Sequence, residues 1–306
     1  MSGTLSGRVA LVTGGGRGIG RAIVEAVHQA GAAVVIADNG TSIGGGGADP
    51  TVAAALAKAL GERAAAFTES IAAPSAAKAA VDFAVHCFGG LDILVNNAAI
   101  LRDAFVFKSD PADWEAVLRT NLFAPFYLIA AATPVMRDQA KARRGGGAWG
   151  RIVNLVSTAG FYGNYGQAAY AAAKAGLAGL TRVTALDMAR SQVTCNAVAP
   201  FAATRVTESI KPQNPAQQAY KDTAMKIPVQ PVADLVAYLA GDDGAKITGQ
   251  LFGVRGREVF LLSQPRPIAT AVAETPDGLG AAVAALAPHF VSLETDLEAF
   301  ANRPVL

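Results

Sequence analysis

A tyrosine and a lysine four residues apart, Tyr170 and Lys174 in the stretch YAAAK, are the first candidates for chemistry. At that spacing both side chains project from one face of a helix, about one turn apart. A nearby ammonium lowers the pKa of a phenol toward working pH, where proton transfer by a side chain is most efficient. Ser157 lies thirteen residues before Tyr170, at the end of an expected strand. Its hydroxyl can hold a substrate oxygen beside the tyrosine, so the three residues predict proton transfer at that oxygen.

A glycine-rich turn indicates a dinucleotide site. Residues Gly14 to Gly20 read GGGRGIG, directly after an apolar strand and at the start of a helical pattern. Such glycines let backbone N–H groups and the helix N-terminus approach a pyrophosphate. Asp38 ends the next expected strand, where its carboxylate would accept hydrogen bonds from the adenosine ribose and repel a 2′-phosphate. NAD is therefore favoured over NADP, although Arg17 in the turn could pair with that phosphate.

A second polar motif, NNAA at Asn96 to Ala99, follows another expected strand. Its polar side chains would tie strand ends together, while the small alanines pass close to the cofactor. An ordinary turn at the end of a strand would explain the motif equally well.

These residues need a scaffold, and the order of the apolar runs predicts one. The segment from Val9 to Ala37 reads strand, glycine turn, helix and strand, which is a βαβ unit. Strands that are apolar on both sides and alternate with helices indicate a parallel sheet covered on both faces. The expected fold class is α/β: a single Rossmann-type doubly wound parallel sheet of about seven strands, with helices on both faces and a C-terminal extension. Further strands are expected at Leu91–Asn97, Gly150–Ser157, Val193–Pro200 and Gly249–Val254.

Length and composition fit one catalytic domain with an extension. Of the 306 residues, 52% are hydrophobic and 16% are charged, as in a folded chain. We expect residues 1–255 to form the dinucleotide-binding catalytic domain. Residues 256–306 hold too little apolar material for a core of their own, so we expect them to pack on the domain or on a partner subunit.

The same composition argues against several classes of function. A net charge of +2 is too small to favour nucleic acid or an anionic membrane. Cys87 and Cys195 lie far apart without the spacing of metal ligands, and we expect buried thiols in a reducing compartment. The three histidines are isolated, so no metal site is expected. The sequence shows neither a signal peptide nor an apolar run of about 18 residues, which predicts a cytoplasmic protein without a membrane span.

Several motifs, taken together and in order, carry a resemblance to a known family. They are TGGGRGIG at 13–20, NNAA at 96–99, Asn121, Ser157, the YxxxK pair at 170–174 and NAVAP ending at Pro200. This combination resembles the classical short-chain dehydrogenase/reductase family, over most of the chain up to about Val254. The resemblance implies a homodimer or a homotetramer, because helices around Asn121 and Tyr170 form the usual interface in that family.

The resemblance also implies a role for each site residue. Tyr170 would be the acid/base and Ser157 would orient the substrate oxygen. Lys174 would bind the nicotinamide ribose and lower the pKa of the tyrosine, while Asn121 would hold a water in a proton relay from a break in its helix. Segment 204–229 corresponds to the family's substrate-facing insertion, and Glu69 or Ser70 stands where an aspartate usually meets the adenine. The implied cofactor-binding set is Thr13, Gly14, Gly16, Arg17, Gly18, Ile19, Gly20, Asp38, Glu69, Ser70, Ile71, Asn97, Ala98, Ala99, Tyr170, Lys174 and Pro200.

A narrower likeness concerns three stretches, at 100–126, 159–189 and 196–209. They resemble the (3R)-hydroxyacyl-CoA dehydrogenase domain of peroxisomal multifunctional β-oxidation proteins and its bacterial single-domain relatives. The glycine-rich insertion after Asp38 fits that branch, as does Phe201-Ala202-Ala203 where the wider family has glycine. The implied function is NAD-dependent interconversion of a (3R)-3-hydroxyacyl-CoA and a 3-oxoacyl-CoA. The alternatives are a 3-oxoacyl-acyl-carrier-protein reductase, a dehydrogenase of steroids or other alcohols, and a non-catalytic dinucleotide sensor.

Overall fold

A single sheet of eight strands organises the chain, of which the computed structural model describes residues 4–142, 150–209, 212, 214–301 and 303–306. The strand order is β3-β2-β1-β4-β5-β6-β7-β8; the first seven strands are parallel and β8 runs antiparallel to β7. From β1 the chain adds β2 and β3 on one side, and it then crosses over to add β4 on the other side of β1. The strand order therefore reverses between β1 and β4. Ligands of open parallel sheets bind at such a switch point, beyond the carboxyl ends of the strands. The strands are β1 (Val9–Thr13), β2 (Ala33–Ala37), β3 (Ala64–Phe67), β4 (Ile93–Asn96), β5 (Gly150–Leu155), β6 (Val193–Phe201), β7 (Leu251–Arg255) and β8 (Glu258–Leu261).

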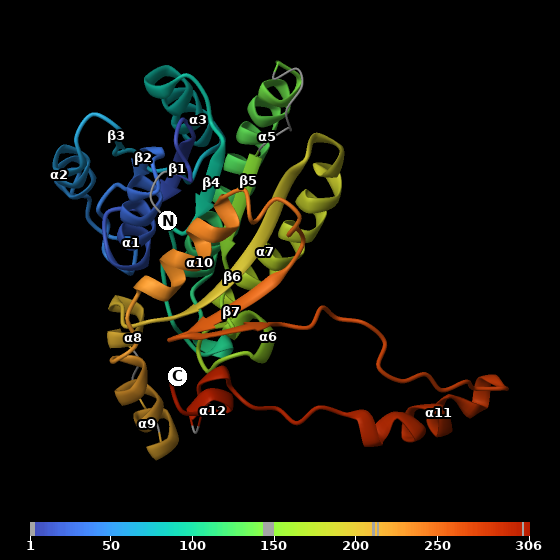
Figure 1. Ribbon diagram of the computed structural model, residues 1–306. Coiled ribbons are helices and arrows are strands. Elements are labelled where there is room, and N and C mark those ends of the chain that lie inside the picture. The colour runs from blue at the N-terminus through green and yellow to red at the C-terminus, as the bar shows by residue number, and fades with distance from the viewer. Residues whose placement is uncertain (1–3, 143–149, 210–211, 213, 302) are drawn as a thin grey trace.

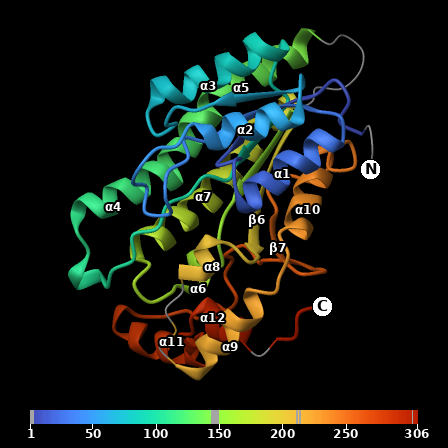
Figure 2. The same cartoon turned by 90° about the vertical axis from the view of Figure 1, so that its left-hand side faces the viewer.

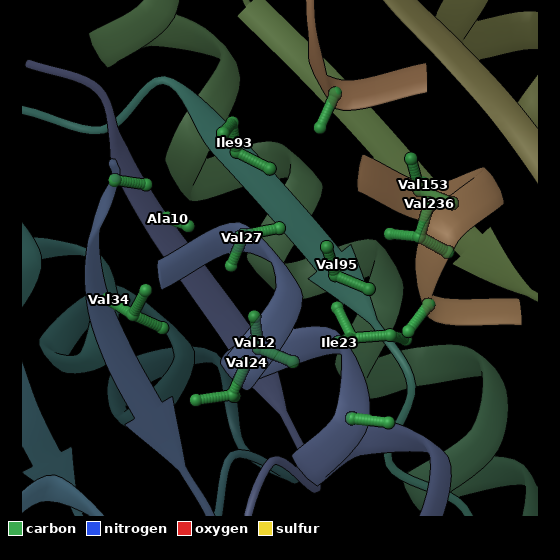
Figure 3. Packing of buried hydrophobic residues seen from close by; sticks show 14 of the residues in the cluster. Ala10, Val12, Ile23, Val24, Val27, Val34, Ile93, Val95, Val153 and Val236 are labelled. Carbon is green, nitrogen blue, oxygen red and sulfur yellow. The ribbon is translucent and has the colours of Figure 1, made fainter. Parts of the chain in front are cut away.

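Helices cover both faces of this sheet because its strands are apolar on both sides. In β1, Ala10 and Val12 join the core on one face, whereas Val9 and Leu11 join the core on the other. Figure 3 shows the first of these cores, where side chains of α1 (Gly18–Gln29) and α10 (Gln230–Ala240) pack on the strands. The opposite face is covered by α3 (Pro74–Phe88), α5 (Ala124–Ala142) and α7 (Ala168–Asp187). The prediction of a doubly wound α/β fold is confirmed.

Two strands have no apolar run that predicted them, although the resemblance implied a strand just before Glu69, where β3 lies. β3 consists of three alanines and a phenylalanine, a composition that does not favour a strand, and it forms along the edge of β2. β8 extends the sheet past residue 255, the expected limit of the catalytic domain. With these two strands the sheet has eight members, where about seven were expected.

The remaining elements are shorter. One of them, η2 (Arg119–Phe123), is a π-helical segment between α4 (Pro111–Leu118) and α5. The others are α2 (Thr51–Leu60), η1 (Val106–Lys108), α6 (Ala159–Tyr162), η3 (Ala189–Ser191), α8 (Arg205–Ser209), α9 (Pro215–Ala224), η4 (Pro276–Gly278), α11 (Leu279–Leu286), η5 (Ala287–His289) and α12 (Asp296–Ala301).

The C-terminal segment leaves the domain and then returns to it. Residues 262–294, including α11, run outward from β8, and α12 then lies beside α9 and α6 beyond one end of the sheet (Figures 1 and 2). The outward part exposes apolar side chains such as Val291, whereas Leu297 and Phe300 of α12 are buried. The returning helix is therefore part of the packed domain.

Two expectations from composition are corrected. Cys195 is buried as expected, but Cys87 is exposed on α3. The continuous helical stretch Pro111–Ala142 is long and apolar enough to cross a membrane by length and composition, although no such run was expected. That composition is shared by helices buried in protein cores, and α5 packs against α3, β4 and β5. Among the described residues, no group of three or more histidine, cysteine, aspartate or glutamate side chains could hold a metal ion.

Candidate active site

A cavity of about 1100 Å³ brings most of the predicted site residues together. It extends from the glycine turn after β1, past the ends of β4, β5 and β6, to α7 and α12. Three predicted residues, Thr13, Gly16 and Asn121, lie outside its lining. The predicted residues that line it are Gly14, Arg17, Gly18, Ile19, Gly20, Asp38, Glu69, Ser70, Ile71, Asn97, Ala98, Ala99, Ser157, Tyr170, Lys174 and Pro200.

The glycine turn needs its glycines for close backbone approach. Gly14 has φ +61°, and a Cβ there would lie 2.9 Å from the Cα of Ala98. A Cβ on Gly20 would lie 2.0 Å from the backbone oxygen of Gly14, so the first turn of α1 touches the end of β1 directly. This packing leaves bare backbone and the start of a helix facing the cavity, which fits the phosphates of a dinucleotide.

Asp38 is placed between the turn and the loop that follows β2. Its Oδ2 accepts a hydrogen bond from the backbone N–H of Gly16 at 2.8 Å, and its Oδ1 accepts one from Gly40 at 2.8 Å. Arg17 is held by the same loop, since one guanidinium nitrogen lies 3.8 Å from Asp49 Oδ2 and another donates to Gly40 O at 3.4 Å. The carboxylate thus lines the cavity where a ribose would lie, while Arg17 already has an acidic partner.

Thr13 and Asn97 join the ends of β1 and β4, as the NNAA motif predicted. The Thr13 hydroxyl accepts from the backbone N–H groups of Asn97 and Ala98 at 2.9 and 3.0 Å. The Asn97 side chain donates to the backbone oxygens of Thr13 and Gly14 at 2.9 and 3.1 Å. Thr13 is buried, so its part in this structure is to hold the turn rather than to line the cavity.

Tyr170, Lys174 and Ser157 meet at the middle of the cavity. The Lys174 Nζ lies 5.7 Å from the centroid of the Tyr170 ring, so the two side chains share one face of α7. The buried ammonium donates to the backbone oxygen of Leu155 at 2.6 Å. Ser157 follows β5, its hydroxyl accepts from the N–H of Ala159 at 3.2 Å, and its side chain favours the ionised form of Tyr170.

The expected lowering of the tyrosine pKa is corrected by the structure. Burial raises the pKa of Tyr170 to about 12; the Ser157 side chain opposes this shift, and the carboxylates of Asp296 and Asp103 add to it. Burial also lowers the pKa of Lys174 to about 8. The positive charge that was expected to stabilise the phenolate is therefore itself weakened by desolvation.

Asn121 lies in the π-helical segment η2, which interrupts the α-helix at the place where a break was expected. Its side chain is fully buried, with Oδ1 accepting from Ile100 N and Nδ2 donating to Ile100 O, both at 2.9 Å. The side-chain amide thus anchors the strand-end segment at Ile100 and does not reach the cavity. The water-holding role of Asn121 stays a prediction.

Sequence reasoning missed a polar group at the end of the cavity away from the glycine turn. Thr158, Gln217, Tyr220 and Asp296 line this end and come from α9, α12 and the residue before α6. Thr158 and Asp296 are joined by a hydrogen bond of 2.8 Å. The neighbouring Phe201, which departs from the family's usual glycine, packs 4.6 Å from the Phe300 ring of α12. That departure was the one sequence signal that a distant aromatic segment docks here.

Comparison with known proteins agrees with this geometry. A family model described as short chain dehydrogenase matches residues 8–217. The hydroxyacyl-CoA dehydrogenase ChsB1 of Mycobacterium tuberculosis is 38% identical over 85% of this chain and 81% of its own length. A 3-oxoacyl-[acyl-carrier-protein] reductase, FabG of Aquifex aeolicus, is 37% identical over 82% of this chain and 97% of its own length.

A longer relative and a solved structure complete the comparison. The peroxisomal multifunctional enzyme type 2 of Drosophila melanogaster is 41% identical over 83% of this chain, which spans 42% of that protein. A crystal structure of a short chain dehydrogenase from Mycobacterium avium superposes with a TM-score of 0.78 and 34% identity, covering 96% of this chain and 99% of that one.

Proposed function

The chain belongs to the short-chain dehydrogenase family, whose members bind NAD or NADP, and we propose that this oxidoreductase interconverts a (3R)-3-hydroxyacyl-CoA and the 3-oxoacyl-CoA with NAD. The main support for this reaction is that Ser157, Tyr170 and Lys174 line the same cavity as the glycine turn. The acyl-CoA substrate is favoured by the likeness to a hydroxyacyl-CoA dehydrogenase and to the peroxisomal multifunctional enzyme.

NAD is favoured over NADP by the charges around the expected ribose site. Asp38 presents a carboxylate there, which would repel a 2′-phosphate. Arg17 could offset that repulsion, but it is already paired with Asp49 and Gly40. The glycine turn would hold the pyrophosphate, and Lys174 would bind the nicotinamide ribose.

The protein's own share of the reaction is proton transfer and alignment. A bound nicotinamide supplies the redox chemistry by accepting or giving a hydride at the carbinol carbon. In reduction the neutral phenol of Tyr170, the form that its raised pKa favours, gives its proton to the carbonyl oxygen. In oxidation the phenolate takes the proton of the substrate hydroxyl, so the rate of oxidation should rise with pH. Ser157, which lines the same cavity as Tyr170, is placed to hold that same oxygen in line.

Replacing Tyr170 tests the assignment directly. Tyr170→Phe should lower kcat for a 3-hydroxyacyl-CoA by ~10²–10⁴-fold, because the proton acceptor is removed while the ring remains. Tyr165→Phe is the matched control, since Tyr165 also lines the cavity but is largely exposed. Turnover by Tyr170→Phe close to that of the control would rule the mechanism out.

The substrate class is tested by comparing initial rates. A 3-oxoacyl chain carried on CoA, the same chain on acyl carrier protein and a set of hydroxysteroids would each be assayed with both coenzymes. A higher kcat/KM on the acyl carrier would favour the reductase function, which the 37% identity to FabG supports as the second candidate. Tight dinucleotide binding without turnover of any of these substrates would instead indicate a sensor.

A further inference from the structure

Asp296 is a buried carboxylate that the reaction described above does not use. It begins α12, is 6% exposed and lines the same cavity as Ser157 and Tyr170. Its Oδ2 accepts a hydrogen bond from the Thr158 hydroxyl at 2.8 Å, and its backbone N–H donates to Gly163 O at 3.3 Å. The first contact orients the side chain, and the second holds the backbone at the start of α12.

The second oxygen of this carboxylate, Oδ1, is buried and has no hydrogen-bond partner among the described residues. A buried oxygen of this kind is costly, and nearly all such atoms in native proteins are satisfied by something. No described lysine or arginine forms an ion pair with Asp296 either. The ionisable groups that interact with it are the phenols of Tyr170 and Tyr220. The backbone N–H groups of residues 296 and 297 favour the carboxylate form, and a hydrogen-bond donor that enters the cavity would supply the bond that Oδ1 lacks.

The position of Asp296 limits which donor that is. Thr158, which holds Oδ2, directly follows Ser157 in the chain, so the acceptor lies close to the point where the reacting oxygen is held. In a 3-hydroxyacyl thioester neither the acyl chain nor the thioester carries a further N–H or O–H group. The first hydrogen-bond donor beyond the reacting hydroxyl is the amide N–H of the pantetheine arm that carries the thioester sulfur. This nitrogen is about six covalent bonds from the carbinol carbon, a span of roughly 7 Å when extended.

We propose that Oδ1 of Asp296 accepts a hydrogen bond from the first amide N–H of the pantetheine arm and so selects thioesters that carry this amide. The inference rests on the proposed function and names the part of the substrate that α12 recognises. Burial raises the pKa of Asp296 to about 6, so the carboxylate is ionised and able to accept at neutral pH and above.

Two small thioesters separate this contact from the rest of the substrate. The N-acetylcysteamine thioester of 3-oxobutanoate keeps the amide at the required place, whereas the S-ethyl thioester of the same acid lacks it. Wild-type enzyme should show a kcat/KM ~10- to 100-fold higher for the amide-bearing compound, the range expected for a hydrogen bond to a charged acceptor. Comparable values for the two thioesters in the wild type would overturn the proposal without any variant.

The variants test whether Asp296 is the acceptor. Asp296→Ala should lose most of that preference, measured as the ratio of kcat/KM for the two thioesters, because any effect of the lost charge on Tyr170 acts on both compounds alike. Asp296→Asn, which offers a neutral carbonyl oxygen, should restore part of it. Glu298→Gln on the same helix is the control and should keep the full preference, because Glu298 caps the backbone N–H of Thr295 and is not in the cavity lining.

The outcomes distinguish this inference from the proposed function. Equal losses on both thioesters in Asp296→Ala would mean that the residue only holds α12 in place, and the inference would be overturned while the proposed function stood. If the wild type reduced neither thioester nor any acyl-CoA, the proposed function would be wrong and the inference with it. A higher KM for NADH in Asp296→Ala with both thioesters would assign the carboxylate to the cofactor and also overturn the proposal.

Discussion

The acidity of Tyr170 depends first on its burial and then on carboxylates that lie far from it in the chain. Burial raises its pKa most, and the carboxylates of Asp296 and Asp103 raise it further. The spacing of Tyr170 and Lys174 predicted that they share a helical face, and the structure confirms it. Spacing contains no information about burial or about distant carboxylates, so the direction of the pKa shift could not be predicted from the sequence.

Asp103 offers a test of this electrostatic control. Its carboxylate accepts a hydrogen bond from Gln167 Nε2 at 3.1 Å and lines the cavity. Asp103→Asn removes a negative charge that disfavours the phenolate, so the pKa of Tyr170 should fall. The kcat/KM for alcohol oxidation rises with pH as the phenol ionises, and in the variant this rise should begin at lower pH. The measurement is a pH profile of NADH formation.

The control for Asp103→Asn is Asp277→Asn, a charge change at an exposed residue of η4 outside the cavity lining. Its profile should coincide with that of the wild type. If the rise of kcat/KM in Asp103→Asn began at the same pH as in the wild type, or at a higher pH, the Asp103 carboxylate would not raise the pKa of Tyr170.

At the level of elements, the contact between β1 and α1 determines where the cofactor turn lies. A Cβ on Gly20 would meet backbone atoms of Gly14 at 2.0 Å, and the amide nitrogen of Asn97 at 2.5 Å. Because backbone cannot rotate away as a flexible side chain does, any residue larger than glycine must push α1 away from the strand. The direction of the backbone N–H groups at the turn depends on that contact.

We therefore expect Gly20→Ala to weaken dinucleotide binding and the fold together. The Kd for NADH, measured by fluorescence titration, should rise about tenfold or more, and stability should fall by about 1–3 kcal/mol. Gly179→Ala in α7 is the matched control, since nothing lies within 4 Å of the added Cβ. Alanine there should leave Kd unchanged and raise the Tm slightly, as expected for glycine replacement inside a helix. Equal Kd values for the two variants would contradict the structural role of Gly20.

The elements that the sequence predicted correctly are those with a strong local signal. β1, α1 and β2 combine apolar runs, a glycine turn and a helical period, and all three lie where expected. β3 carries no such signal, because alanine favours helices and the strand exists through pairing with β2. β8 likewise depends on its pairing with β7 and alternates half-buried with exposed residues.

At the scale of the whole molecule, the two ends of the cavity come from opposite parts of the chain. The glycine turn lies near the N-terminus, whereas α12 closes the other end near the C-terminus. The last residues are held by Arg255, whose guanidinium donates to the backbone oxygens of Phe300, Arg303 and Pro304. An extension packing on the domain or a partner was expected, but its docking site was not, because it depends on contacts between Phe201, Phe260 and Phe300 that lie far apart in sequence.

Phe300 is the residue on which the docking of α12 should depend most. Its ring is 2% exposed and lies 4.6 Å from Phe201 and 5.8 Å from Phe260, measured between ring centroids. Truncating a buried phenylalanine costs about 3–5 kcal/mol, enough to release a six-residue helix from the surface. Phe300→Ala should therefore raise KM for the acyl substrate and speed hydrogen exchange of the α12 amides.

The same variant should leave the Kd for NADH unchanged, because the glycine turn lies at the other end of the cavity and belongs to the core formed by β1 and α1. Val291→Ala is the control within the C-terminal segment, since Val291 is 84% exposed and should alter neither quantity. If Phe300→Ala weakened NADH binding as much as substrate binding, α12 would be supporting the whole domain and not one end of the site. If it changed neither KM nor exchange, the docking of α12 would not depend on this aromatic contact but on the other contacts of the helix, such as those of Leu297 and Asp296.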